Sequence, residues 1–132
     1  MQRTFVPLDS GAFMIRTISA LVFCLLAVPA LADNLTLAKH YKATGTNPDG
    51  STYSGDVRVD VISDTTFAIV WTIAGAKYTG FGMHRNDAIA ATYEIDGQPG
   101  LVVYKIDGNG WNGAWAIRGQ NGNGTERLTP AD

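Results

Sequence analysis

The stretch DVRVDVISDTTFAIVWTIA, residues 56–74, decides the fold class. Residues 57–61 alternate apolar and charged side chains with a period of two, which is typical of a β-strand that turns its valines to one face of a sheet. After a tight turn at Ser63-Asp64, residues 65–74 are rich in β-branched and aromatic side chains. Their large apolar residues again share one face: Phe67, Ile69, Trp71 and Ile73. The stretch therefore predicts two neighbouring strands.

The chain on either side of this stretch repeats the pattern of short strands and turns. Turn signals such as Asn47-Pro48-Asp49-Gly50-Ser51 and Asp96-Gly97-Gln98-Pro99-Gly100 separate the segments, since proline presets φ and glycine tolerates positive φ. Between residues 33 and 132, no segment of ten or more residues has the 3.6-residue apolar period of a helix. We therefore predict six further strands, at residues 39–46, 77–84, 88–95, 101–106, 111–119 and 125–129.

Short connections favour antiparallel pairing of consecutive strands in meander order. Eight such strands must hide their edges, and closing the sheet into a barrel does so. The predicted fold class is all-β, an eight-stranded antiparallel up-and-down (meander) barrel, with a β-sandwich as the alternative. Glycines inside strands favour the barrel, because they permit sharp coiling and a neighbouring aromatic ring can cover the bare backbone. They occur in three aromatic-x-glycine elements: Tyr53-Ser54-Gly55, Tyr78-Thr79-Gly80 and Trp111-Asn112-Gly113.

Residues 1–32 have the composition of a signal peptide. Arg16 supplies a positive charge, residues 18–28 are almost purely apolar, and Ala30-Leu31-Ala32 offers the small residues that a signal peptidase needs. Pro29 interrupts the apolar run before it reaches the about 20 residues of a membrane-spanning helix. We expect cleavage after Ala32. The expected product is periplasmic or secreted and has no membrane anchor.

The expected cleavage leaves residues 33–132 as a single domain. Residues 1–13 resemble an upstream start-site extension, which makes Met14 the expected true start. Cys24 is the only cysteine and leaves with the signal peptide, so the domain has no disulfide, thiol nucleophile or cysteine metal site. A lipoprotein would need a small residue before the acylated cysteine, where this chain has Phe23.

Composition and motifs argue against several classes of function. The chain has 10 Lys+Arg and 12 Asp+Glu, without a basic stripe for nucleic acid or an anionic membrane. His40 and His84 fall on different predicted strands without a metal-ligand motif, and no Gly-x-Ser-x-Gly elbow is present. We predict a protein that is not an enzyme and that needs no metal or cofactor.

Aromatic side chains on the strands are the best candidates for a binding site. They either fill the barrel as a packed core or line a cup that holds one small apolar or aromatic ligand. In meander order, the turns at Asn47 and Gln98 share the end of the barrel with the longer connections, and we take this end as the mouth. The predicted ligand contacts are Tyr53, Trp71, Tyr104, Trp111 and Trp115, with Asn47 and Gln98 at the mouth.

Glu126 stands out among the charged residues. It shares a strand face with Leu128, which is expected to point inward. A buried carboxylate needs partners, so we predict a pairing with an arginine such as Arg118 or with tyrosine hydroxyls. The expected role is structural.

Several motifs of the domain support a family resemblance. They are GTNPDGSTYSG at residues 45–55, Val70-Trp71, Tyr78-Thr79-Gly80-Phe81-Gly82, Val103-Tyr104, Asp107-Gly108, Gly113-Ala114-Trp115 and Gly124-Thr125-Glu126-Arg127-Leu128-Thr129-Pro130. With them the chain resembles a family of short exported bacterial proteins of undefined role, some of which are labelled fibronectin-binding. The resemblance covers nearly all of the domain and implies a shared fold, but brings no catalytic motif. The architecture also resembles avidins and lipocalins, although the lipocalin Gly-x-Trp signature is absent.

Two functions follow from these expectations. The first is an exported, non-enzymatic barrel that holds a small apolar or aromatic ligand or acts through its loops. The second is a protein–protein adhesion or inhibitor module with a filled core, whose partner is an extracellular protein. A cavity above about 300 Å³ favours the first, and a filled core with an exposed apolar patch favours the second.

Overall fold

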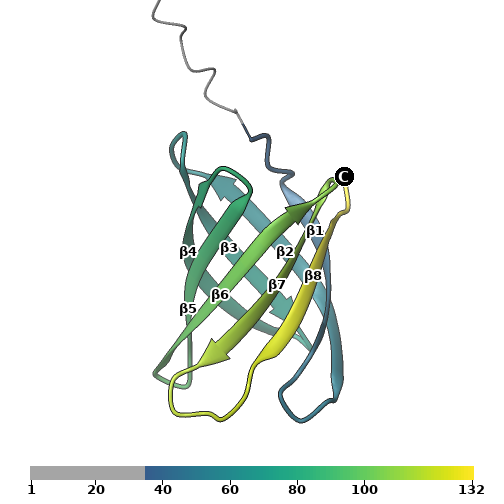
Figure 1. Ribbon diagram of the computed structural model, residues 1–132, viewed down its shortest axis with the longest axis vertical. Coiled ribbons are helices and arrows are strands. Elements are labelled where there is room, and N and C mark those ends of the chain that lie inside the picture. Colours follow the sequence, from purple (N-terminus) through teal and green to yellow (C-terminus); the bar gives the residue numbers. More distant parts are fainter. Residues whose placement is uncertain (1–34) are drawn as a thin grey trace, which may run out of the picture. The chain divides into compact units, whose positions relative to one another are not determined.

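The computed structural model describes residues 35–132, and the predicted signal peptide lies outside them. Eight strands follow one another along the chain, as predicted (Figure 1). Their bounds are β1 (His40–Thr46), β2 (Thr52–Val61), β3 (Thr66–Ile73), β4 (Ala76–Arg85), β5 (Ala88–Ile95), β6 (Gln98–Asp107), β7 (Gly110–Ile117) and β8 (Gly124–Pro130).

The strands form a closed antiparallel barrel in meander order. Each strand pairs with its sequence neighbour, and β1 closes the sheet by pairing with β8 from Tyr41↔Pro130 to Thr46↔Thr125. The predicted barrel is therefore confirmed, and the sandwich is excluded. The part of the chain that the structure describes contains no helix, and so none long and apolar enough to cross a membrane.

Alternate residues of every strand point into the barrel. On β3, Phe67, Ile69 and Trp71 are buried, while the residues between them are only partly covered. One end of the interior is filled by a cluster of rings around Trp111, whose centroid lies 4.7 Å from that of Tyr41, 6.0 Å from that of Phe67 and 5.4 Å from that of Tyr104. This cluster makes a solid core because it leaves no room for a ligand.

Most glycines inside the strands lie beneath aromatic rings of the neighbouring strand, and of the glycines in the three aromatic-x-glycine elements only Gly55 does not, because Ile73 covers it. Gly113 pairs with Tyr104, and a Cβ placed on this glycine would collide with the Tyr104 ring. Bare backbone therefore gives the rings a place to lie flat against the wall. The same cross-strand arrangement joins Gly45 to Tyr53, Gly82 to Phe67, Gly100 to Tyr93 and Gly124 to Trp115.

When one of these glycines is replaced with alanine, the loss in the free energy of unfolding should depend on how far the ring above it can move. Gly113→Ala should lower the free energy of unfolding by about 3 kcal/mol, because the new methyl meets the Val103 carbonyl and the fully buried Tyr104 ring, neither of which has room to move. Gly100→Ala should cost about 1 kcal/mol, because the methyl meets only the half-buried ring of Tyr93, which can swing away. Urea unfolding of both variants measures the difference, and equal losses would contradict it.

The turn between β5 and β6 is shorter than predicted. Asp96 and Gly97 have φ of 51° and 75°, the pattern of a two-residue hairpin turn that matches the twist of its strands. The residues from Gln98 to Gly100, expected in the turn, instead begin β6. Pro99 fits there because its carbonyl still accepts a hydrogen bond, from the Arg118 N–H at 2.9 Å.

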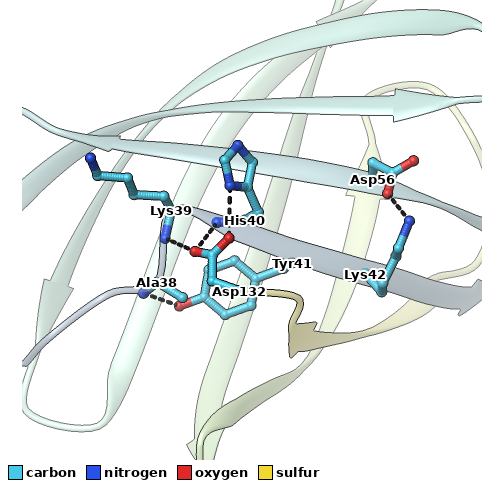
Figure 2. Close-up of polar contacts among 7 residues, drawn as sticks. All are labelled: Ala38, Lys39, His40, Tyr41, Lys42, Asp56 and Asp132. Carbon is cyan, nitrogen blue, oxygen red and sulfur yellow. Dashed lines mark hydrogen bonds and ion pairs between the residues drawn. The ribbon is translucent and has the colours of Figure 1, made fainter.

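The end of the barrel opposite this turn is covered by the segment before β1. Leu35 and Leu37 pack against the core, and the Ala38 N–H donates to the Tyr41 hydroxyl at 2.9 Å. Figure 2 shows how Asp132 holds the same segment by accepting hydrogen bonds from the backbone N–H groups of Lys39 and His40 and from His40 Nδ1. These contacts fix the covered end, so the other end is the candidate entrance.

Candidate functional site

A cavity of about 180 Å³ opens at the end of the barrel formed by the β1–β2, β3–β4, β5–β6 and β7–β8 connections. This is the end predicted as the mouth, and in Figure 1 it is the lower one, opposite the C-terminus. The cavity does not reach the about 300 Å³ that we expected of a ligand-binding barrel, so only a molecule smaller than a drug-sized ligand fits inside it. It is lined by Asn47, Tyr53, Trp71, Ile73, Tyr78, Tyr93, Ile95, Val102, Tyr104, Trp115 and Glu126.

Because alternate residues of each strand point inward, side chains from several strands together form the wall of the cavity. Aromatic rings supply most of the lining and meet edge to face: the Trp71 and Tyr93 centroids are 5.5 Å apart, and those of Tyr53 and Trp115 are 6.3 Å apart. The rim carries Asn47, whose side chain donates to Ser51 Oγ at 3.0 Å within the β1–β2 turn. The cavity is therefore an aromatic cup with a polar group at its edge.

One carboxylate lies at the bottom of this cup. Glu126 on β8 is 6% exposed and is the only buried charged residue among residues 35–132. Its Oε1 accepts hydrogen bonds from the Tyr104 hydroxyl at 2.6 Å and from Trp71 Nε1 at 3.0 Å, while its Oε2 accepts one from the Tyr53 hydroxyl at 2.7 Å. The predicted pairing with tyrosine hydroxyls is correct, and the Trp71 N–H adds a partner that the sequence did not suggest.

The predicted alternative partner, Arg118, lies elsewhere. It follows the inward-facing Ile117 and is exposed, so its guanidinium group is on the outer side of the wall. The cavity lining contains no lysine, arginine or histidine. Glu126 therefore brings one negative charge into the cup, and among the lining residues only neutral donors stabilise it.

Burial and this charge together raise the pKa of the surrounding tyrosines. Burial has the larger effect on Tyr53, Tyr93 and Tyr104, and the negative charge of Glu126 adds to it. The pKa of Tyr93 rises to about 12, and burial also raises the pKa of Tyr41 at the covered end. All four hydroxyls are thus held in the protonated form.

The alkaline titration of the protein should reveal these tyrosines. Unfolded tyrosine ionises near pH 10, whereas the buried hydroxyls keep their protons to higher pH, so the free energy of unfolding should fall as pH rises above about 10. Absorbance of phenolate, followed with circular dichroism, should show the buried tyrosines ionising only as the fold is lost. Ionisation of all five tyrosines near pH 10 with the sheet intact would contradict this.

A second polar group of the lining is incompletely satisfied. The Trp115 Nε1–H is buried and has no hydrogen bond of normal geometry, although it lies close enough to the Tyr53 hydroxyl to lower the pKa of that hydroxyl slightly. Buried donors are rarely left without an acceptor. The Nε1 atom lies over the backbone of Gly124 and is not exposed to the cavity.

The structure brings five of the seven predicted contacts together. Besides Asn47 at the rim, these are Tyr53, Trp71, Tyr104 and Trp115.

The other two predicted contacts are corrected. Trp111 is only 2% exposed and belongs to the ring cluster at the opposite end of the interior, where Tyr104 separates it from the cavity. Gln98 is exposed and does not line the cavity, because the two-residue turn places it in β6.

Tyr78 and Tyr93 also line the cavity, although we did not predict them there from the sequence. Both lie at inward positions of their strands, and Tyr78 belongs to one of the aromatic-x-glycine elements. The period of two was therefore a usable signal for both. Among residues 35–132, His, Cys, Asp and Glu side chains form no group of three that could hold a metal ion.

Comparisons with known proteins give the fold and not a family. No protein-family model matches the sequence, and no curated protein does. Among solved structures, the chain is similar to the redesigned β-barrel b11L5F_LGL, with a TM-score of 0.60, 18% identity and coverage of 73% of this chain and 92% of that one. It is also similar to the redesigned β-barrel mFAP1 bound to DFHBI, with a TM-score of 0.53, 24% identity and coverage of 70% and 94%. At these identities the similarity establishes a shared β-barrel fold.

Proposed function

We propose that this protein is an exported, non-enzymatic barrel that binds a small, largely apolar molecule in the cavity at its mouth. The observation that carries this is the cavity itself, an apolar cup that holds a few polar groups in fixed positions. Such a combination is the usual form of a small-molecule site, in which apolar walls supply affinity and polar groups orient the ligand. The export signal at residues 1–32 supports a periplasmic or secreted location.

The use of similar barrels supports the same proposal. The redesigned barrel mFAP1 and the protein EF1p2_mFAP2b were both solved bound to DFHBI. Closed barrels of eight strands have an interior just wide enough for side chains or for one small ligand. This chain has both arrangements, since the Trp111 cluster fills one end and the cavity occupies the other.

Native mass spectrometry of the protein purified from its own host tests the proposal. A retained small molecule should appear as an added mass and should be lost from Trp115→Leu, which removes an aromatic wall but keeps an apolar side chain over Gly124. Leu101→Ala is a matched control on the outer face, where Leu101 is 60% exposed. An equal added mass in both variants would place the ligand outside the cavity. No added mass, together with unchanged fluorescence of Trp71 and Trp115 across a library of small molecules, would contradict the proposal.

A second candidate is a protein–protein module, for which the outer surface provides an observation. Phe81 and Met83 on β4 are 55% and 50% exposed, and Leu101 and Val103 on β6 are both 60% exposed. The register joins them across β5 in two rows, Phe81–Thr92–Leu101 and Met83–Ala90–Val103. Exposed apolar patches of this kind mark interaction surfaces.

Surface plasmon resonance on immobilised extracellular proteins, fibronectin first, tests this candidate. Replacing Leu101 and Val103 together by serine should weaken any specific binding at least about tenfold, while the cavity variant Trp115→Leu should leave it unchanged. The reverse pattern would assign the binding to the mouth loops.

A further inference from the structure

We propose that the ligand of the cavity is a small organic cation, with a tertiary or quaternary ammonium group lying against the aromatic wall close to Glu126. This inference rests on the proposed function and specifies the chemistry of the molecule that the same site takes.

The first argument for a cationic ligand is the charge of the side chains that line the cavity. Glu126 is the only acidic or basic side chain of the cavity lining, and the other titratable lining residues are tyrosines. Glu126 is buried, no basic side chain lines the cavity, and the neighbouring Arg127 pairs with Asp107, so the field of the carboxylate in the cavity is weakly screened. An anionic ligand would be repelled, and a cation would supply the missing counter-charge.

The hydrogen bonds of Glu126 show that the carboxylate can still take a partner. Two ionised oxygens offer about four acceptor positions, and Tyr53, Tyr104 and Trp71 use three of them. Oε1 accepts two hydrogen bonds, and Oε2 accepts one. The remaining position on Oε2 can receive the N–H of a tertiary ammonium ion, and a quaternary ion needs only the negative charge.

The walls provide the second requirement of a cation site. Electron-rich faces of tryptophan and tyrosine attract ammonium groups, and cages of several such rings are a common way to bind quaternary ammonium ligands. Five rings besides Tyr104 line this cavity: Tyr53, Trp71, Tyr78, Tyr93 and Trp115. The hydroxyls of Tyr53 and Tyr93 keep their protons, as their raised pKa values show, and so add no negative charge to that of Glu126.

A neutral apolar ligand fits this site less well. It would contact the rings but leave the buried carboxylate without a counter-charge, and closing the cavity over it would remove water from that charge. A cation with apolar substituents satisfies both the rings and the carboxylate.

Isothermal titration calorimetry on the purified protein tests the proposal with matched probes. Choline carries a quaternary ammonium and a hydroxyl, 3,3-dimethylbutan-1-ol has the same shape without the charge, and tetramethylammonium has the charge without the hydroxyl. Choline should bind at least about tenfold more tightly than its neutral isostere. Glu126→Gln should remove most of this preference while changing the affinity for the neutral isostere little, because the side chain keeps its size.

The outcomes separate this inference from the proposed function. Equal or tighter binding of 3,3-dimethylbutan-1-ol would overturn the cation while leaving a small-molecule site in place. Preference for choline that persists in Glu126→Gln would show that the carboxylate is not the recognition element and would overturn the inference. If no probe binds, the cation is excluded, and the mass-spectrometric test then decides whether the cavity holds any ligand.

Discussion

Trp111→Ala should lower the free energy of unfolding by about 3–5 kcal/mol, a large part of the about 5–15 kcal/mol that stabilises a typical domain. Trp111 is 2% exposed, and its ring lies against Tyr41, Phe67 and Tyr104. The substitution would remove the largest side chain of the cluster and leave a void, because the closed sheet around it cannot collapse inward. Urea unfolding followed by circular dichroism measures the loss.

A comparison with Trp115 tests whether the loss of stability comes from the core position of Trp111 or would follow from any large substitution on β7. Trp115 lies on the same strand and the same face, but it is half-buried in the cavity wall. Trp115→Leu should therefore cost less stability than Trp111→Leu. The Trp111 substitution should leave ligand contacts in place, since Trp111 does not line the cavity. A smaller loss from Trp111→Leu than from Trp115→Leu would contradict the assignment of Trp111 to the core.

The two tryptophans also show what the sequence can predict. Alternation placed both residues on the inner face of the barrel, and this is correct because a strand period of two is fixed by backbone geometry. Their depth along the barrel axis depends on how far each strand is shifted against its neighbours, which the period does not contain. The core tryptophan and the cavity tryptophan were therefore indistinguishable before the register was known.

The sequence predicted that Glu126 is buried and needs hydrogen-bond donors, but not which residues donate to it. Glu126 could be expected to be buried because it alternates with Leu128, and a buried carboxylate requires donors. Arg118 could already have been excluded, because it directly follows the inward-facing Ile117 and successive residues of a strand point to opposite faces. The choice of Tyr53, Tyr104 and Trp71 from the available donors depends on side chains of β2, β6 and β3 reaching Glu126 across the barrel interior, which only closure of the barrel brings about.

Glu126→Ala should lower the free energy of unfolding by about 3–4 kcal/mol. It would remove three hydrogen bonds to a charged acceptor and leave the Tyr104 hydroxyl and the Trp71 N–H without a partner in the barrel interior. The Tyr53 hydroxyl can still donate to the Thr125 carbonyl at 3.3 Å, which limits the cost for that group. The pKa of Tyr53, Tyr93 and Tyr104 should fall at the same time, because the negative charge that raises it is gone.

Glu126→Gln distinguishes the hydrogen bonds from the charge. Its amide oxygen can still accept from the Tyr104 hydroxyl and the Trp71 N–H, and its amide nitrogen can donate to the Tyr53 oxygen, so we expect a loss of only about 1–2 kcal/mol. The tyrosine pKa values should nevertheless fall as they do in Glu126→Ala, because both variants are neutral at this position. Stability from urea unfolding and ionisation from phenolate absorbance should thus respond differently in the two variants. An equal loss of stability in both would mean that the carboxylate acts mainly through its charge, and unchanged tyrosine titration would mean that it carries none in the folded protein.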